Sequence, residues 1–315
     1  MRTPDRAGVL RAAAKVAEIL APTPLLPVEH GGRTFWLKAE CLQPVGAFKI
    51  RGAWHRLTDL SEQERAGGVV AVSSGNHAQG VAWAARRLGL AATIVMPRDA
   101  PPIKLERTRE LGAEVVLYDR MTEDREAIGK AIAAERGAAY VHAFADPWVI
   151  EGQGSAAIEA AAQLGREPAR IISCCGGGGL TAGLALACPE AEVIPVEPAG
   201  WDDVARSLAS GSIQSVGPNP PLTACDALQT FATSPLNFAV LQRRCLFGLS
   251  ATEDEVRAAQ RFAFSRLRLV LEPGGAVALA AVLAGKVAAD EDTVVIASGG
   301  NVDPAAFAQV IGSPG

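Results

Sequence analysis

Short apolar runs alternate with helix-like stretches through most of this 315-residue chain. Between residues 67 and 144, the runs GGVVAVS, AATIVMP, EVVLYD and AAYVHAF predict four strands. The stretches between them, NHAQGVAWAARRLG, IKLERTRELG and EDREAIGKAIAAERG, predict three helices. Strands that alternate with helices in this way are typical of a mostly parallel sheet in an α/β fold.

The same alternation starts again at about residue 147. We expect, in order, helix 154–164, strand 170–175, a glycine run with a helix, strand 192–197, helices 252–267 and 272–286, and strand 293–298. The sequence therefore predicts two three-layer αβα units with a cleft between them. Ligands in such sheets bind beyond the carboxyl ends of the strands, and the motifs described below lie at those ends.

Composition narrows the classes of function. Hydrophobic residues make up 49% of the chain and charged residues 20%, as in ordinary globular proteins. The net charge of −4, with scattered basic residues, argues against a nucleic-acid partner. The apolar stretches are too short to cross a membrane, and the N-terminus resembles an amphipathic helix more than a signal peptide. Six cysteines without a CxxC pair argue against structural zinc and favour buried thiols in a cytoplasmic protein.

Four consecutive glycines, Gly176 to Gly179, follow the strand RIISCC and precede a helix. Backbone N–H groups at such a turn can surround an anion at the positive end of the helix. A tight turn without a ligand is one alternative. A dinucleotide site is another alternative, because Glu197 follows about 20 residues later, where such a site has the acidic residue that binds the ribose. Thr181 stands where GxGxxG needs its last glycine, so the spacing favours a phosphate site without excluding a nucleotide-binding oxidoreductase.

Lys49 lies among small and apolar residues in PVGAFKIRGA. Removal of water from a lysine lowers its pKa and gives a neutral amine that can form a Schiff base. Taken alone, the same residue also fits an exposed lysine at the start of a helix.

Two polar turns add further candidates. Ser73, Ser74, Asn76 and His77 open a helix and suit a carboxylate, although SSGN is also a good helix cap. Ser298 ends the strand TVVIAS and suits a heteroaromatic nitrogen, although an ordinary turn serine fits equally.

Taken together, FKIRGA, SSGNHAQG, GGGG and SGGNVD occur in an order that resembles the pyridoxal-phosphate enzymes of the threonine dehydratase and serine racemase family. The likeness extends from PTPLLP (22–27) through EPGGAVALAA (272–281) to the end of the chain. It implies the tryptophan-synthase-β fold, with pyridoxal 5′-phosphate (PLP) in the cleft. On this fold we expect residues 1–58 and 143–315 to form a large PLP-binding domain and residues 65–142 a small domain.

The resemblance also implies roles for individual residues. Lys49 would hold PLP covalently, and the other residues around the cofactor would be Phe48, Asn76, Gly176, Gly177, Gly178, Gly179, Leu180, Glu272 and Ser298. The residues that receive the substrate would be Ser73, Ser74, Asn76, His77 and Arg125.

The activity that this family membership implies is loss of water from L-threonine or L-serine, giving a 2-oxo acid and ammonia, with Lys49 as the base for the Cα proton. Ser74 is similar to the acid that serine racemases place opposite the lysine, so racemisation of serine or aspartate is an alternative. Arg125 resembles an arginine that meets substrate in racemase-like members, which leaves 3-hydroxyaspartate open, although a solvated helix charge fits better. The segment 223–240 follows the family pattern only loosely.

Glu197, the Trp201 carbonyl and Asp203 resemble the family's divalent-cation site, and oxygen ligands suit Mg²⁺, with Ca²⁺ or Mn²⁺ as alternatives. An acidic loop without a metal is the other interpretation. The family likeness further implies a homodimer. Because the chain ends at Gly315 without the regulatory domain of biosynthetic threonine dehydratases, we do not expect inhibition by an end-product amino acid.

Overall fold

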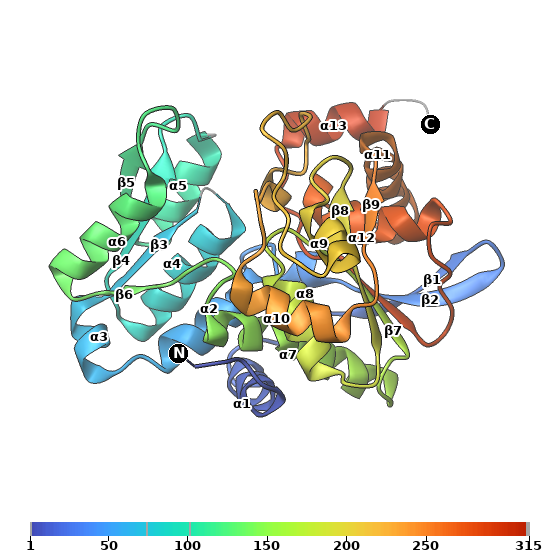
Figure 1. Ribbon diagram of the computed structural model, residues 1–315, viewed down its shortest axis with the longest axis horizontal. Helices are drawn as coiled ribbons and strands as arrows, with labels where there is room; N and C mark the ends of the chain where they lie inside the picture. Colours follow the sequence, from blue (N-terminus) through green and yellow to red (C-terminus); the bar gives the residue numbers. More distant parts are fainter. Residues whose placement is uncertain (1, 74, 101, 313–315) are drawn as a thin grey trace.

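Two sheets lie side by side in the computed structural model, which describes residues 2–73, 75–100 and 102–312 (Figure 1). The larger sheet has six strands in the order β1-β2-β10-β7-β8-β9, and the smaller has four in the order β5-β4-β3-β6. The strands of the larger sheet are β1 (Leu25–His30), β2 (Arg33–Lys38), β7 (Arg170–Cys174), β8 (Glu192–Pro198), β9 (Leu249–Ala251) and β10 (Thr293–Ile296). Those of the smaller are β3 (Val69–Val72), β4 (Ala92–Pro97), β5 (Glu114–Tyr118) and β6 (Ala139–Tyr140). All pairings are parallel except that of β1 with β2.

Helices surround both sheets (Figure 1). In chain order they are α1 (Arg6–Ala17), α2 (Lys49–Thr58), α3 (Glu62–Gly67), α4 (Asn76–Leu88), α5 (Pro102–Glu110), α6 (Arg125–Arg136), α7 (Pro147–Leu164), α8 (Gly179–Ala187), α9 (Asp203–Ser210), α10 (Pro235–Arg244), α11 (Glu253–Phe262), α12 (Pro273–Leu283) and α13 (Pro304–Gly312). Short 3₁₀ turns lie at Glu40–Leu42 and Asp226–Leu228. No helix among the described residues is both long and apolar enough to cross a membrane.

The smaller sheet shows why the chain forms three layers. Val69 and Ala71 of β3 pack into a core with α4, whereas Val70 and Val72 pack with Ala133 of α6 on the opposite face. Alternate residues of a strand point to opposite faces, so a run that is apolar throughout needs a helix on each side. The predicted αβα architecture is confirmed.

Several element boundaries differ from the prediction, among them the following three. The strand expected over 138–144 ends at Tyr140, because the ring nitrogen Nδ1 of His142 accepts hydrogen bonds from the next backbone N–H groups and turns the chain. The helix expected from residue 154 begins at Pro147, since Asp146 caps it. The helix expected over 252–267 changes after Phe262 to a π-helix, Ala263–Leu267.

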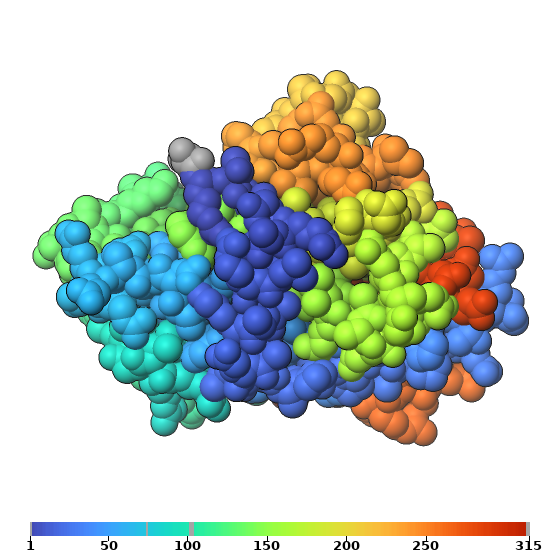
Figure 2. Space-filling model, turned by 90° about the horizontal axis from the view of Figure 1, so that it is seen from below, coloured from blue at the N-terminus to red at the C-terminus, as the bar shows by residue number. Residues whose placement is uncertain are grey.

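Helix α1 connects the cores of the two units. Val9 packs in the core of the larger sheet, whereas Val16 and Leu20 pack in the core that includes β3 and α4. Figure 2, seen from below, shows the helix lying across the boundary between the two halves of the chain. The N-terminal segment therefore contributes to holding the two sheets in one orientation.

Helix α2 occupies the centre of the molecule, and close packing fixes its position. Gly52 of α2 lies against Gly152 of α7, where a Cβ atom on Gly152 would overlap the backbone of α2. One residue earlier, Arg51 binds Glu40 through two hydrogen bonds, of 2.7 and 2.8 Å, and both side chains are fully buried. Burial alone disfavours the charge of Glu40, but the guanidinium keeps its pKa below the ordinary value. The pair therefore holds the first turn of α2 against the 3₁₀ turn that follows β2.

We predict that Arg51→Met destabilises the protein by about 3–5 kcal/mol, because it leaves the buried Glu40 carboxylate without its ion-pair partner. Urea unfolding followed by circular dichroism measures this change. Arg257→Met is the control, since Arg257 forms an exposed pair with Asp254 and should leave the unfolding midpoint unchanged. Equal midpoints for the two variants would contradict the prediction.

Candidate active site

A cavity of about 170 Å³ lies where the strand ends of the two sheets meet. It is lined by the ends of β3, β7 and β10 and by the first residues of α2, α4 and α8. The predicted site residues that line it are Phe48, Lys49, Ser73, Asn76, His77, Arg125, Gly176, Gly177, Gly178, Gly179, Leu180, Glu272 and Ser298. Ser74 lies outside the described residues. Residues that are far apart in the sequence thus meet as the four ordered motifs led us to expect.

Lys49 is the first residue of α2, and its amine faces this cavity. Nζ donates a hydrogen bond to the carbonyl oxygen of Ala143 at 2.7 Å and forms no ion pair with a carboxylate of the described residues. Burial lowers its pKa to about 8. Lys38, in contrast, is buried but paired with Glu159. The surroundings of Lys49 therefore give it a larger fraction of neutral, nucleophilic amine near neutral pH than an ordinary exposed lysine has.

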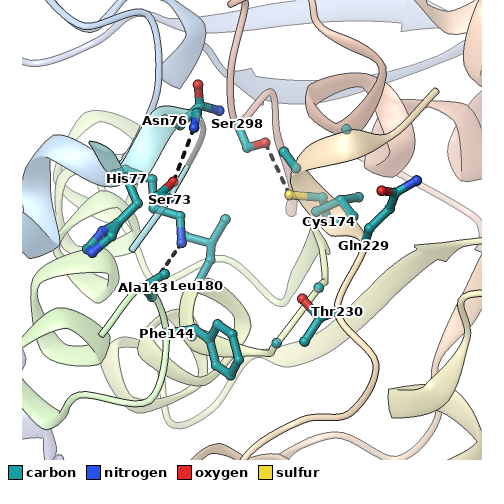
Figure 3. A pocket seen from close by; sticks show the side chains of 18 of the residues that line it. Ser73, Asn76, His77, Ala143, Phe144, Cys174, Leu180, Gln229, Thr230 and Ser298 are labelled. Carbon is teal, nitrogen blue, oxygen red and sulfur yellow. Dashed lines mark hydrogen bonds between the residues drawn. The ribbon is translucent and has the colours of Figure 1, made fainter. Parts of the chain in front are cut away.

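The turn that follows β3 places the polar side chains of Ser73 and Asn76 at the cavity, across from Cys174 (Figure 3). Asn76 begins α4, and its amide nitrogen donates to Glu272 Oε1 at 2.6 Å. Its amide oxygen accepts a hydrogen bond from Asn301 at 2.8 Å. One amide proton of Asn76 remains for a ligand, since an amide nitrogen carries two. Burial raises the pKa of Glu272 to about 7, so this carboxyl changes charge near neutral pH.

His77 contributes to the site mainly through its backbone. Its ring Nε2 lies 2.9 Å from the carbonyl oxygen of Val141, and the ring is almost fully buried. Burial, with a smaller effect of the Lys49 charge, lowers the pKa of His77 to about 3. The imidazole is therefore neutral, and Nε2–H donates to Val141, which leaves the backbone N–H groups at the start of α4 to meet an anion.

The glycine run forms a cradle at the first turn of α8. Gly178 is the N-cap residue with φ 88°, a conformation that favours glycine. A Cβ atom on Gly177 would overlap the ring of Phe144, and the Gly177 carbonyl accepts hydrogen bonds from Thr233 and Asn237. These contacts fix the loop against the cavity wall at the first turn of α8, where backbone N–H groups and the helix dipole favour a phosphate.

Ser298 lies just after β10 on the same wall as Cys174, the last residue of β7 (Figure 3). The Cys174 thiol donates to Ser298 Oγ, and the sulfur–oxygen distance is 3.1 Å. An amine, a phosphate cradle and a hydroxyl thus line one cavity. They fit the aldehyde, phosphate and ring nitrogen of PLP.

Sequence reasoning missed four groups at this site. Asn301 lies within SGGNVD, but the motif alone indicates no role for it, and the sequence predicts only a buried thiol for Cys174. Lys104 of α5 forms an ion pair with Asp226 of the larger unit at 2.6 Å, and both residues line the cavity. Asp226 belongs to the segment 223–240, which follows the family pattern only loosely. This loose match is the sequence feature that points to an unassigned residue there.

The predicted metal ligands lie outside the cavity. Glu197 is fully buried, and its two carboxylate oxygens accept hydrogen bonds from the backbone of Val204 and Ala205. Asp203 accepts a hydrogen bond from Thr233 N. Within the described ranges, no three His, Cys, Asp or Glu side chains are arranged to hold a metal ion.

Comparison with known proteins identifies the family. The model described as "Pyridoxal-phosphate dependent enzyme" matches residues 16–299, and the chain belongs to this family, as the ordered motifs predicted. L-threo-3-hydroxyaspartate ammonia-lyase of Saccharomyces cerevisiae is 38% identical over 320 residues, which cover 99% of this chain and 97% of that protein.

Two solved structures confirm the predicted fold. Maize serine racemase has a TM-score of 0.91 and 33% identity, with 98% of this chain and 97% of that chain covered. A threonine deaminase of T.th. has a TM-score of 0.87 and 40% identity, with 95% of this chain and 99% of that chain covered. The two-unit αβα architecture with mostly parallel sheets is thus the one these PLP enzymes share.

We predict that Gly177→Ala weakens PLP binding at least about 10-fold, since the methyl group must displace Phe144 and with it the cradle. Fluorescence titration of the apoprotein with PLP measures the affinity. Gly217→Ala is a matched control, because a Cβ atom there meets nothing within 4 Å. If both variants bind PLP as the unmodified protein does, the assignment of the cradle is wrong.

Proposed function

We propose that this protein is a PLP-dependent ammonia-lyase that removes water from L-threonine or L-serine and releases a 2-oxo acid and ammonia. The observation that carries the proposal is the cavity-facing amine of Lys49, which burial leaves with a pKa of about 8 and no ion-pair partner among the described residues. Bound PLP would withdraw electrons from the substrate Cα. The residues around it determine what happens next.

Lys49 has two tasks in this proposal. Its amine would hold the cofactor, and once freed by the substrate it would take the Cα proton at Nζ. The Ala143 carbonyl, 2.7 Å from Nζ, limits where that amine can move. A base must reach its proton within hydrogen-bond distance, and an amine with a lowered pKa accepts that proton near neutral pH.

The remaining residues orient the reactants. Backbone N–H groups at the start of α4, beside Asn76 and His77, would bind the substrate carboxylate. Asn76 would donate its remaining amide proton to the phenolic oxygen of PLP, and Glu272 fixes the Asn76 amide for this task. Ser298 would donate to the ring nitrogen. A hydroxyl cannot protonate that nitrogen as a carboxylic acid can, which favours elimination through Cβ.

A second candidate is elimination from 3-hydroxyaspartate. Arg125 lines the cavity at the start of α6, where its guanidinium suits a second carboxylate. The yeast relative that is 38% identical carries the name of this activity. Racemisation of serine or aspartate is a third candidate, with Ser74 as the acid opposite Lys49.

A product assay decides among these candidates. The purified protein with PLP is supplied with L-serine, L-threonine or L-threo-3-hydroxyaspartate, and 2-oxo acid, ammonia and the chirality of the recovered amino acid are measured. We expect equal amounts of oxo acid and ammonia, with serine or threonine turned over faster. D-serine that accumulates faster than pyruvate would reject the lyase assignment in favour of a racemase.

Lys49→Ala should abolish the visible absorbance band of bound PLP and lower turnover at least about 10³-fold, the scale typical of removing a group central to catalysis. Lys130→Ala is the control, because Lys130 is an exposed lysine of α6 and should retain both properties. In the unmodified apoprotein, the rate of PLP attachment should rise as the pH passes about 8, because only the neutral amine reacts. A variant that keeps the band without Lys49 would disprove the assignment.

We further propose a structural divalent cation, Mg²⁺ first, at Glu197, the Trp201 carbonyl and Asp203. Burial raises the pKa of both carboxyl groups, that of Asp203 to about 6, and a cation would relieve this cost. We expect chelation to lower the melting temperature, and Mg²⁺ to restore it, without altering the PLP absorbance. An unchanged melting temperature and unchanged activity after chelation would count against the cation.

We also propose a division into domains, a cellular location and an oligomeric state. We take residues 1–58 and 143–315 as the large domain and 65–142 as the small one, which is supported by the two separate sheets. A cytoplasmic location is supported by the six cysteines, all free and buried. A homodimer is supported by the resemblance to the family alone, and light scattering would detect it.

A further inference from the structure

The hydrogen bond between Cys174 and Ser298 connects two neighbouring strands at the wall of the active site. Strands β7 and β10 are parallel and adjacent, so their carboxyl ends reach the cavity together. Cys174 and Ser298 are each only 3% exposed, and Cys174 Sγ lies 3.1 Å from Ser298 Oγ (Figure 3). Both residues line the cavity.

The protons on these two groups determine what Ser298 can do. A thiol has one proton to donate, whereas a hydroxyl has one proton and two lone pairs. Burial raises the pKa of Cys174 to about 11, so the thiol keeps its proton and directs it at Ser298 Oγ. Among the hydrogen bonds of the described residues, the Ser298 hydroxyl has no other partner. Its own proton is therefore left for a ligand in the cavity.

We propose that Cys174 is a positioning residue that fixes the Ser298 hydroxyl as a donor toward the ring nitrogen of PLP. A nitrogen that accepts this bond must be unprotonated. Without the thiol's hydrogen bond, both lone pairs of Ser298 Oγ would be free, and the hydroxyl would turn more readily to accept a hydrogen bond from a protonated ring nitrogen. The thiol thus keeps the ring a weaker electron sink, which suits elimination through Cβ better than reactions that store charge on the ring. This inference rests on the place given to Ser298 in the proposed function.

The neighbouring cysteine provides a matched control. Cys175 is also buried, lines the same cavity and follows Cys174 directly. Its thiol contacts the carbonyl of Gly176 at 3.5 Å, and not Ser298. A role in packing alone predicts similar effects for loss of either thiol, whereas a positioning role predicts an effect for Cys174 only.

The test uses PLP labelled with ¹⁵N in its ring and records the nitrogen resonance of the bound cofactor without substrate. The unmodified protein should show an unprotonated nitrogen. In Cys174→Ala, the equilibrium between unprotonated and protonated nitrogen should shift about 5-fold toward the protonated form, the scale of one neutral hydrogen bond. Cys174→Ser restores a donor and should return the original resonance. Cys175→Ala should leave the resonance unchanged.

Two results would overturn the inference. One is a protonated ring nitrogen in the unmodified protein, a result that can be measured without any variant. The other is a resonance in Cys174→Ala, or in the bulkier Cys174→Val, that matches the unmodified protein. Because no substrate is present, these outcomes do not depend on whether the protein releases ammonia, so failure of this inference and failure of the proposed function can be told apart.

Discussion

The partial burial of the Lys49 amine, with no ion-pair partner among the described residues, is the constraint on which the rest of the site depends. A lysine buried in this way resists protonation, so the fold must hold it in place without a carboxylate. The Ala143 carbonyl supplies the single hydrogen bond that Nζ makes within the described residues. Beneath it, Arg51 and the Gly52–Gly152 crossing fix the helix that carries the lysine. The ion pair that stabilises α2 thus involves Arg51 and not Lys49.

Two sets of one lysine and one glutamate differ in the charges around them and in their pKa values. Lys38 and Glu40 are buried among opposite charges, and Arg51 keeps the Glu40 carboxyl ionised. Lys49 is half-buried and Glu272 is buried, neither has such a partner among the described residues, and their pKa values move toward neutrality from opposite sides. Shifts of this kind are typical of functional sites. The same residue types therefore stabilise the fold in one place and line the candidate active site in the other.

Much of this arrangement could be predicted from the sequence, because it depends on local patterns. Alternating apolar runs predicted the two αβα units, and four ordered motifs predicted the contents of the cavity. Contacts that arise from the order of strands within a sheet could not be predicted in this way. Cys174 meets Ser298 because β7 lies beside β10, although 124 positions separate the two residues. The early end of β6 escaped prediction for a similar reason, since it depends on a ring nitrogen of His142 that a strand pattern does not reveal.

The site also shows why two sheets are needed for one reaction. Groups that would meet the cofactor phosphate and ring nitrogen belong to the larger unit, whereas the turn for the substrate carboxylate belongs to the smaller. Asn76 crosses the boundary, because Glu272 and Asn301 of the larger unit bind its two amide ends. Lys104 and Asp226 make a second connection at the cavity wall. The first connection uses the residue that would contact the cofactor itself, so the two units cannot separate without releasing Asn76 from its partners. The hydrogen bonds of Asn76 therefore both connect the two units and position the side chain that would contact the cofactor.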